Sequence, residues 1–220
     1  MKVSEIFTSI DGEGIRTGYP VTFIRLHGCN LRCSYCDSMY AVEGRDYTEM
    51  SVFEIVEECK KFSTRKVTLT GGEPLIHQNV RHLILMLIDE GFEVNIETNG
   101  AVLLKDKLSD LNVEQNKKLI ITMDWKSASS GESDKMIYDN LEYLAEQDVL
   151  KFVVGNHDDL EQMKQLIVGH NPKCNIFVSP IFGKIEAKDI VDYIITNHLD
   201  NVRIQLQLHK FIWESNMRGV

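Results

Sequence analysis

The sequence lacks any apolar stretch long enough to span a membrane. Its longest apolar run, LILMLI at 83–88, is far shorter than the roughly 20 residues that a membrane-spanning helix needs. The first residues, MKVSEIFTSIDGEG, contain neither the long apolar core nor the small-residue cleavage site of a secretory signal. We therefore expect a cytoplasmic protein that works without a membrane.

Blocks of basic residues are also missing. The chain carries 24 lysines and arginines against 33 aspartates and glutamates, which gives a formal net charge of −9. A basic face that follows the phosphate backbone is the usual footprint of a nucleic-acid-binding protein. We expect no nucleic-acid partner, and we favour a small-molecule substrate.

No repeat, low-complexity tract or proline-rich linker divides the 220 residues, so we expect a single domain over 1–220. Short β-rich runs alternate with amphipathic stretches. Strands are predicted at 21–26, 66–70, 93–98, 119–125, 149–154, 174–179 and 202–207. Helices are predicted at 51–62, where Ser51-x-x-Glu54 forms a capping pattern, and at 79–91, 134–147, 157–169 and 186–197. This alternation is typical of βαβ units with a parallel sheet, as an incomplete barrel or an open doubly wound sheet.

Polar and glycine-rich segments follow four of the predicted strands. In either fold, ligands bind at the carboxyl ends of parallel strands. The segments are the cysteine-rich stretch after 21–26, GGEP after 66–70, TNG after 93–98 and KSASSG after 119–125. We expect these four segments to meet at one site.

Cysteine is scarce but clustered. Three of the five cysteines, Cys29, Cys33 and Cys36, lie within HGCNLRCSYCD at 27–37. In a reducing compartment such clustering favours metal ligation over disulfides. The other two cysteines stand alone, as small buried side chains usually do; they are Cys59 and Cys174.

The spacing C-x3-C-x2-C suits an iron–sulfur cluster better than zinc. A structural zinc site takes four ligands, commonly as two separated pairs. No second pair is present, so the neighbouring His27 would have to be the fourth ligand. Three thiolates on one loop suit a [4Fe–4S] cluster that keeps one iron open for chemistry.

The motif resembles that of the radical S-adenosylmethionine superfamily, in which an aromatic residue, here Tyr35, precedes the last cysteine. TGGEP at 70–74 is similar to the second motif of that superfamily. The resemblance implies an α/β fold, an incomplete (partial) TIM-like barrel of parallel strands with flanking helices. It also implies that the open iron chelates S-adenosylmethionine and that one-electron reduction yields a 5′-deoxyadenosyl radical.

Three further stretches resemble the 7-carboxy-7-deazaguanine synthase family. They are FTSIDGEGIRTGYPVTFIRLHGCN, CDS at 36–38 and the ending LQLHKFIWESNMRGV. The resemblance implies a carbon–nitrogen lyase that converts 6-carboxy-5,6,7,8-tetrahydropterin to 7-carboxy-7-deazaguanine, with loss of ammonia, in queuosine-type biosynthesis. It further implies Mg²⁺, a homodimer and a low-potential electron donor such as flavodoxin or ferredoxin.

The resemblance also assigns residues, with a substrate-binding stretch at 7–16, a cluster loop at 27–38 and a closing segment at 205–220. Cofactor contacts are expected at Tyr35, Cys36, Asp37, Gly72, Lys126, Ser127 and Ser179. Ser38 is expected to bind magnesium, for which a hydroxyl is a suitable hard ligand. Its ordinary alternative is a turn or a helix cap.

Substrate contacts are expected at Ile10, Asp11, Gly12, Glu13, Arg25 and Thr70. Arg25 offers a planar donor for the carboxylate of a pterin, and its alternative is a structural ion pair. Glu13 would accept from the amino edge, or be a solvated turn residue. Asp11 replaces the usual glutamine of the family, which puts the detail of recognition in question. His209 would close over the pterin or merely pack.

Two other functions share some of these features. An activating enzyme that abstracts hydrogen from a glycine of a partner protein would also have the three cysteines and GGEP. It gives no reason for the SIDGEG stretch or for Ser38. A non-catalytic iron–sulfur carrier or zinc-binding module would need four protein ligands.

Overall fold

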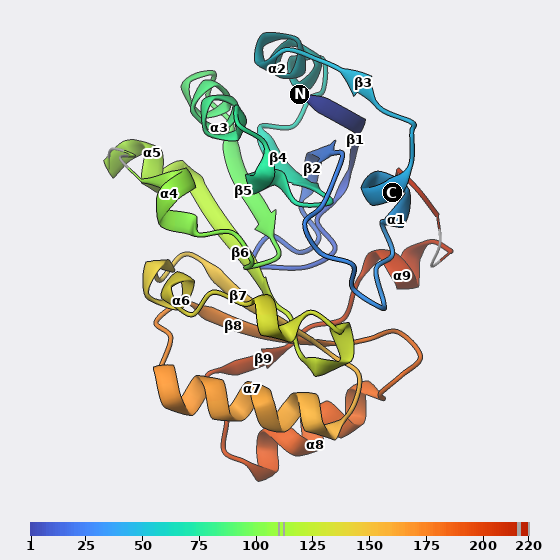
Figure 1. The fold of residues 1–220 in the computed structure, drawn as a ribbon, viewed down its shortest axis with the longest axis vertical. Helices are drawn as coiled ribbons and strands as arrows, with labels where there is room; N and C mark the ends of the chain where they lie inside the picture. The colour runs from blue at the N-terminus through green and yellow to red at the C-terminus, as the bar shows by residue number, and fades with distance from the viewer. Residues whose placement is uncertain (110, 112, 215–216, 220) are drawn as a thin grey trace.

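The chain folds into an open sheet of nine strands flanked by helices (Figure 1). The computed structural model describes residues 1–109, 111, 113–214 and 217–219. The strand order across the sheet is β3-β1-β2-β4-β5-β6-β7-β8-β9. The strands are β1 (Lys2–Ile10), β2 (Pro20–Leu26), β3 (Thr48–Glu49), β4 (Lys66–Gly71), β5 (Glu93–Thr98), β6 (Leu119–Trp125), β7 (Val149–Val154), β8 (Asn175–Pro180) and β9 (Val202–Ile204).

The predicted fold class is confirmed, with two strands more than the sequence indicates. From β2 to β9 all neighbouring strands pair in parallel. β1 pairs antiparallel with β2, and the short β3 pairs antiparallel with β1. β1 was not predicted because apolar and polar residues do not alternate regularly along its sequence. Only Val3 of its nine residues is buried.

Nine α-helices and three 3₁₀ turns connect the strands in the described part of the chain. The α-helices are α1 (Met39–Glu43), α2 (Val52–Lys60), α3 (Val80–Asp89), α4 (Leu104–Leu108), α5 (Val113–Lys118), α6 (Asp139–Tyr143), α7 (His157–His170), α8 (Ala187–Thr196) and α9 (His209–Ile212). The 3₁₀ turns are η1 (Pro74–Ile76), η2 (Ala128–Ser130) and η3 (Ser133–Lys135). The capping box predicted for α2 is present, since Ser51 and Glu54 bond each other's backbone N–H.

Two predicted elements are shorter than expected. The helix predicted at 134–147 is wrong in extent, because the Ile137 N–H and the Asn140 side chain donate to the Gly100 carbonyl instead. The chain therefore bends between η3 and α6. The strand predicted at 202–207 ends at Ile204, and just beyond it the Gln205 side chain bonds the backbone of Gly14.

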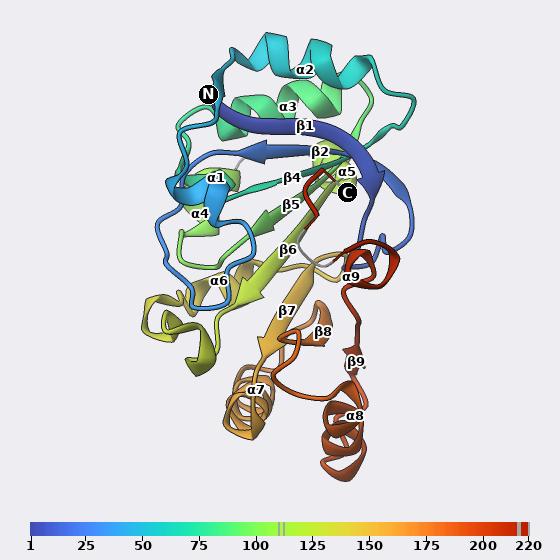
Figure 2. The same cartoon turned by 90° about the vertical axis from the view of Figure 1, so that its right-hand side faces the viewer.

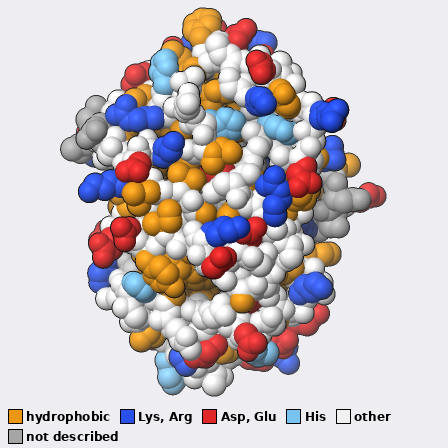
Figure 3. All heavy atoms as spheres, in the orientation of Figure 1, with side chains coloured by type: hydrophobic (Ala, Val, Ile, Leu, Met, Phe, Trp, Pro, Cys, Tyr) orange, Lys and Arg blue, Asp and Glu red, His pale blue; other side chains and the backbone are white. Residues whose placement is uncertain are grey.

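The helices and the C-terminal segment lie on opposite sides of the curved sheet. Helices α2, α3, α4, α7 and α8 follow its outer side, while α9 and residues 217–219 lie on the inner side (Figures 1 and 2). No helix in the described residues is long and apolar enough to cross a membrane. On the face drawn in Figure 3, basic side chains are interspersed with acidic ones.

Side-chain alternation gives the sheet one apolar and one polar face. In β4, Val67 and Leu69 are fully buried in the core with the helices, whereas Thr68 and Thr70 face the inner side. The strands β5 and β6 repeat the pattern, whereas on β7 only Lys151 is polar on the inner face, between Val149 and Val153. Cys59 and Cys174 are buried in the apolar core, as predicted.

Candidate active site

A cavity of about 700 Å³ opens on the inner side of the sheet, at the carboxyl ends of its parallel strands. This volume lies within the ordinary range for small-molecule sites. All four segments singled out from the sequence contribute to its lining, through the cysteine loop, Thr70–Gly72, Thr98–Asn99 and Lys126. The predicted convergence of these segments is therefore confirmed.

The cysteine loop is held in shape by segments distant in sequence. The Arg32 N–H donates to Glu132 at 2.6 Å, and the Ser34 N–H donates to the Ser130 carbonyl at 2.9 Å. The Asn99 side chain donates to Asn30 at 2.8 Å and to Cys29 Sγ at 3.6 Å. The loop is thus fixed by η2, η3 and the end of β5.

The three thiols of the loop suit an iron–sulfur cluster. Cys29, Cys33 and Cys36 are free, half-buried and all line the cavity. Burial raises the pKa of the Cys33 and Cys36 thiols, while nearby Lys126 lowers both. A thiol with a raised pKa keeps its proton until a metal binds. Iron binding then releases the proton and stabilises the thiolate. Three such ligands on one short loop are what a cluster with an open iron needs.

The glycines of GGEP let the end of β4 pack directly on the cysteine loop. A Cβ on Gly72 would overlap the Gly28 carbonyl, and one on Gly71, whose φ is +143°, would overlap the Leu26 carbonyl. Both glycines line the cavity. Close backbone packing therefore requires them, whether or not a ligand approaches.

Glu73 of the same motif is fully buried and was not singled out from the sequence. Its carboxyl accepts from the Leu75 N–H at 2.9 Å, the Thr98 hydroxyl at 2.9 Å and the Asn99 N–H at 2.7 Å. Burial raises the pKa of Glu73 to about 7, although these hydrogen bonds lower it. Glu73 thus joins GGEP to the Asn99 turn that contacts Cys29.

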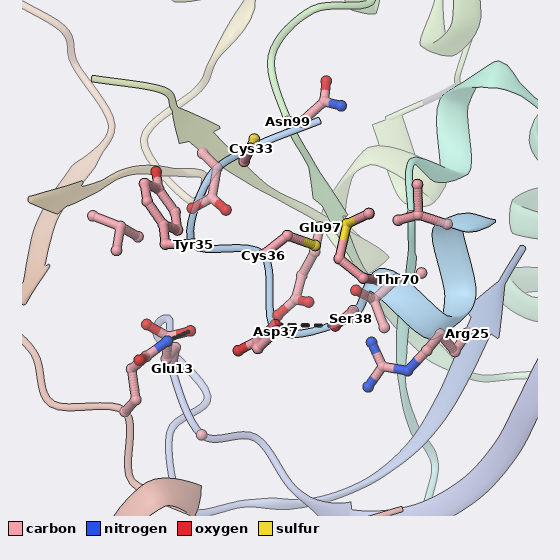
Figure 4. Close-up of a pocket in the computed structure, with 18 of the residues that line it drawn as sticks. Glu13, Arg25, Cys33, Tyr35, Cys36, Asp37, Ser38, Thr70, Glu97 and Asn99 are labelled. Carbon is pink, nitrogen blue, oxygen red and sulfur yellow. Dashed lines mark hydrogen bonds between the residues drawn. The ribbon is translucent and has the colours of Figure 1, made fainter. Parts of the chain in front are cut away.

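A row of polar side chains crosses the inner face of neighbouring strands. Arg25 of β2 lies opposite Thr70 of β4 in the strand register. The Thr70 side chain hydrogen-bonds Glu97 of β5, whose pKa is raised by burial and lowered by Lys151. Figure 4 shows Arg25, Thr70 and Ser38 on one side of the pocket and Glu13 on the other.

A chain of ion pairs crosses the floor of the cavity. Lys151 Nζ lies 2.8 Å from Glu13 Oε2 and 3.3 Å from Asp124 Oδ1, and Lys126 Nζ lies 2.9 Å from Asp124 Oδ2. Burial raises the pKa of Asp124, but Lys126 and Lys151 lower it to about 2. Burial likewise lowers the pKa of Lys151, but Asp124 and Glu13 raise it well above its usual value. Asp124 and Lys151 therefore stay charged at neutral pH.

Glu13 has further polar partners on its other side. Ser179 Oγ lies 3.2 Å from Glu13 Oε1, and Gln207 Nε2 lies 3.4 Å from Glu13 Oε2. Ser179 does not itself line the cavity. It supports the position of Glu13 from β8.

Two polar groups near the ion-pair chain lack a partner within the described residues. The Tyr35 hydroxyl and Ser127 Oγ are buried without a hydrogen bond. Burial raises the pKa of Tyr35 to about 12, so it stays a neutral donor. Because buried polar groups normally have partners, the Tyr35 hydroxyl, whose residue lines the cavity, fits a site that a polar ligand completes.

The C-terminal segment contributes to the mouth of the cavity. His209, Lys210 and residues 217–219 line it, and Lys210 Nζ lies 3.5 Å from Asp37. The Leu208 N–H donates to the Gly12 carbonyl at 3.1 Å. The predicted closing segment also includes residues 215, 216 and 220, which lie outside the described residues.

Most residues expected at the site line the cavity. They are Ile10, Gly12, Glu13, Arg25, Cys29, Cys33, Tyr35, Cys36, Asp37, Ser38, Thr70, Gly72, Lys126 and His209. Asp11, Ser127 and Ser179 do not line it. Glu97, Asp124 and Lys151 also line it and were not named as site residues, and Gln207 lies within the predicted closing segment at 205–220.

Asp11 pairs with the protein rather than with the cavity. It is buried, and its carboxylate accepts from Arg16 Nε at 2.9 Å and from the Thr68 hydroxyl at 2.7 Å. Arg16 also donates to the Val67 carbonyl at 2.9 Å. The charge that Asp11 adds in place of glutamine is thus matched by the guanidinium of Arg16.

Ser38 lies at the cavity with one hydrogen bond to its neighbour. Its hydroxyl donates to Asp37 Oδ1 at 3.0 Å, as the dashed line in Figure 4 marks. Among the described residues, the three cysteines included, no three His, Cys, Asp or Glu side chains are grouped to hold a single metal ion. A [4Fe–4S] cluster differs in this respect, because each of its cysteine ligands binds a different iron.

Comparisons with known proteins agree on one family. Residues 23–124 match the model of the Radical SAM superfamily. The 7-carboxy-7-deazaguanine synthase of Clostridium acetobutylicum is 42% identical over 100% of this chain and 99% of its own. The 7-carboxy-7-deazaguanine synthase of Methanospirillum hungatei is 44% identical over 96% of this chain and 85% of its own.

Solved structures agree with the sequence relatives. The crystal structure of QueE from Escherichia coli matches with a TM-score of 0.73 at 26% identity, over 94% of each chain. Streptococcus suis SuiB matches with a TM-score of 0.55 at 13% identity, over 84% of this chain and 48% of its own, which is a likeness of fold alone.

Proposed function

Because this chain belongs to the 7-carboxy-7-deazaguanine synthase family, we propose that it converts 6-carboxy-5,6,7,8-tetrahydropterin to 7-carboxy-7-deazaguanine with loss of ammonia. The observation that carries the proposal is the identity of 42% with such a synthase over the whole chain. The reaction is a radical ring contraction in 7-deazapurine biosynthesis, of the queuosine type. We propose that residues 1–220 act as a single radical S-adenosylmethionine domain.

The superfamily implies a [4Fe–4S] cluster and S-adenosylmethionine. Cys29, Cys33 and Cys36 would hold the cluster, which together with S-adenosylmethionine supplies radical chemistry on a C–H bond when bound. The Tyr35 hydroxyl, which has no hydrogen-bond partner among the described residues, would bond a polar group of the cofactor. The other proposed cofactor contacts in the cavity are Cys36, Asp37, Gly72 and Lys126. Ser127 and Ser179 do not line the cavity and would support its lining from behind.

Arg25 is the proposed ligand of the substrate carboxylate. Its guanidinium lines the cavity on the side of Thr70 and Ser38. A planar guanidinium binds a carboxylate through two parallel hydrogen bonds, which fixes orientation as well as affinity. The carboxylate end of the pterin would therefore lie toward β2.

Glu13 is the proposed acceptor for the amino edge of the pterin, across the cavity from Arg25. Lys151 Nζ lies 2.8 Å from Glu13 Oε2, so an ion pair holds the Glu13 side chain at this side of the cavity. An ionised carboxylate accepts hydrogen bonds only, which matches the N–H groups of that edge. The other proposed substrate contacts are Ile10, Gly12 and Thr70, which line the cavity. Asp11 would support this stretch through its ion pair with Arg16.

Magnesium is the third proposed cofactor. Ser38 would supply one hard oxygen ligand, since Mg²⁺ keeps several waters and binds through few protein groups. The substrate carboxylate on Arg25 would be a second ligand from the same side of the cavity. This proposal rests on Ser38 lining the cavity together with Arg25.

The proposed electron donor follows from the chemistry, since a low-potential protein such as flavodoxin or ferredoxin would deliver the electron. The proposal that the enzyme works in the cytoplasm as a homodimer rests on the family resemblance alone. An activating enzyme for a glycyl radical shares the cysteines and GGEP, but the relatives named above are not of that kind. A non-catalytic carrier has no use for a cavity of about 700 Å³ beside the thiols.

The test is an anaerobic turnover assay. The reconstituted enzyme would receive reductant, S-adenosylmethionine, Mg²⁺ and 6-carboxytetrahydropterin, and the products would be identified by mass and ultraviolet spectrum. We expect many turnovers to 7-carboxy-7-deazaguanine, with the cofactor regenerated. Accumulation of 5′-deoxyadenosine beside intact pterin would uphold the radical chemistry and overturn the proposed substrate.

A further inference from the structure

Glu5 of β1 lies directly across from Arg25 of β2. The antiparallel register pairs the two residues, and a shift in register between Val3 and Glu5 marks a β-bulge at this point. A bulge changes the direction of the side chains that follow it, and bulges are common beside active sites. The irregularity of β1 thus sets which residue of β1 lies opposite Arg25.

Two donors bind the same oxygen of Glu5. Arg25 Nε donates to Glu5 Oε1 at 2.6 Å, and the Tyr40 hydroxyl of α1 donates to the same atom at 2.6 Å. The Arg25 side chain is 16% exposed and that of Glu5 is 23% exposed. Glu5 does not line the cavity, whereas Arg25 and Tyr40 do.

This arrangement selects which edge of the guanidinium faces the cavity. Because Glu5 takes the Nε proton, the two terminal nitrogens are left to point inward, as Figure 4 shows for Arg25. The Arg25 guanidinium carbon also lies 6.0 Å from the centre of the Phe7 ring and 5.9 Å from that of Tyr40. One hydrogen bond and two rings therefore restrict its rotation.

We propose that Glu5, supported by Tyr40, is a positioning residue that presents the two terminal nitrogens of Arg25 to the carboxylate of the substrate. This inference rests on the proposed function, which makes a carboxylated pterin the ligand of Arg25. Glu5 touches no substrate itself. It acts by restricting a side chain that would otherwise sample many rotamers before binding.

The charge of Glu5 acts against this benefit. A carboxylate beside Arg25 reduces the positive potential that attracts a substrate anion. If the charge effect were larger, removing Glu5 would tighten the binding of the carboxylated pterin. If positioning is larger, removing it weakens that binding, so the sign of the effect separates the two.

The experiment compares two ligands on matched variants of the reconstituted enzyme. Dissociation constants are measured anaerobically by calorimetry for 6-carboxytetrahydropterin and for tetrahydropterin without the carboxylate. The variants are Glu5→Ala, Glu5→Gln, Tyr40→Phe and, as a control for lost charge on the neighbouring strand, Glu49→Gln. Glu49 is exposed on β3 and lies opposite Lys2.

We expect Glu5→Ala to weaken binding of the carboxylated pterin about tenfold, the order of one charged hydrogen bond, and to leave the other pterin unaffected. Glu5→Gln keeps an acceptor and should stay near wild type. Tyr40→Phe should give a smaller loss of the same kind, and it keeps the test valid if Glu5→Ala fails to fold. Glu49→Gln should change neither ligand.

Equal weakening for both pterins would show a merely structural role and overturn the inference. Tighter binding of the carboxylated pterin would show that charge outweighs positioning, which also overturns it. A wild-type enzyme that binds both pterins equally, or neither, would instead overturn the proposed role of Arg25 and the positioning role with it. If the wild-type enzyme binds the carboxylated pterin more tightly than the other pterin, and Glu5→Ala changes neither dissociation constant, the proposed function stands and only the positioning role of Glu5 is overturned.

Discussion

The two faces of the central strands differ in almost every physical property. On the outer face, side chains such as Leu69 and Ile96 are fully buried against the helices. On the inner face, the same strands present Thr70 and Glu97 to the cavity. Residues that are adjacent in the sequence thus have different roles, one in the core and one at the cavity, because successive side chains of a strand point to opposite sides.

The comparison explains how one sheet can be both a stable core and a polar site. Apolar burial stabilises the fold in proportion to the area removed from water. Charges on the inner face are costly to desolvate unless they are paired. Here Lys151 is paired with both Glu13 and Asp124, so the polar face keeps its charges within the fold.

Replacing one cysteine of the cluster loop and one of the apolar core should give the largest difference between the two regions, in bound iron and in turnover. Cys33→Ala removes one of three proposed cluster ligands, so we expect bound iron and all turnover to be lost while the fold persists. Cys59→Ala, in the apolar core, should keep its iron and lose about 1 kcal/mol of unfolding free energy. Iron analysis and thermal unfolding check both, and loss of iron in the Cys59 variant would break the comparison.

Adjacent residues of β4 should separate stability from binding. Leu69→Ala should lower the free energy of unfolding by about 2–5 kcal/mol, the usual range for a buried leucine, with substrate KM unchanged. Thr70→Val keeps the volume and removes the hydroxyl that bonds Glu97, so its effect should fall on substrate KM. Denaturant unfolding and steady-state kinetics measure the pair; a shared effect would contradict the division of faces.

Glu73 lies beneath the site and should make stability depend on pH. Burial raises its pKa from 4.5 to about 7, so between these pH values the folded state holds a proton that the unfolded state has released. The free energy of unfolding should therefore fall as pH rises through this window and level off above it. At 1.36 kcal/mol per pH unit the fall attributable to Glu73 is about 3 kcal/mol.

Glu73→Gln removes the titrating group, so its unfolding free energy should be flatter between pH 4.5 and 7 than that of the wild type. Urea unfolding across this range gives both curves. If the unfolding free energies of the two proteins depend on pH in the same way between pH 4.5 and 7, Glu73 is already ionised in the folded state across this range, which would contradict its raised pKa.

Arg25→Ala tests the part of the inner face that is proposed to bind the substrate carboxylate. Loss of charged hydrogen bonds worth roughly 1.5–3 kcal/mol should raise the pterin KM by about 10- to 100-fold. Cleavage of S-adenosylmethionine without substrate should persist, because the cluster loop is untouched. Steady-state kinetics and a product assay for 5′-deoxyadenosine distinguish the two, and equal loss of both would count against the assigned role.

Ser38→Ala should have the smallest effect of the series. Since Mg²⁺ takes most of its ligands from water and substrate, removing one hydroxyl should shift the magnesium titration by a few-fold and leave the maximal rate similar. Turnover measured against Mg²⁺ concentration reports this shift. An unchanged titration would remove Ser38 from the proposed magnesium site.

Sequence patterns predicted what depends on contiguous residues. The cysteine loop, GGEP and the central parallel strands each have a local signal, and they lie where the strand ends converge. β1 was missed because its burial pattern is irregular at the bulge. That omission also hid the Glu5–Arg25 pair, which joins residues on two strands.

The polar partners within the cavity depend on strand register. Asp124 and Lys151 look like ordinary polar positions in their strands, and only the pairing of β6 with β7 brings them opposite each other. Asp11 matched a family stretch, yet its partner Arg16 approaches it only because the loop after β1 turns back on itself. Contacts of this kind follow from the fold and have no local sequence signal.

The most direct test of the account is an anaerobic crystal structure of the reconstituted enzyme with S-adenosylmethionine and 6-carboxytetrahydropterin. The account predicts the pterin on the inner face of the sheet, with its carboxylate on the two terminal nitrogens of Arg25 and its amino edge on Glu13. A pterin bound elsewhere, or bound in this cavity with its carboxylate away from Arg25, would contradict it.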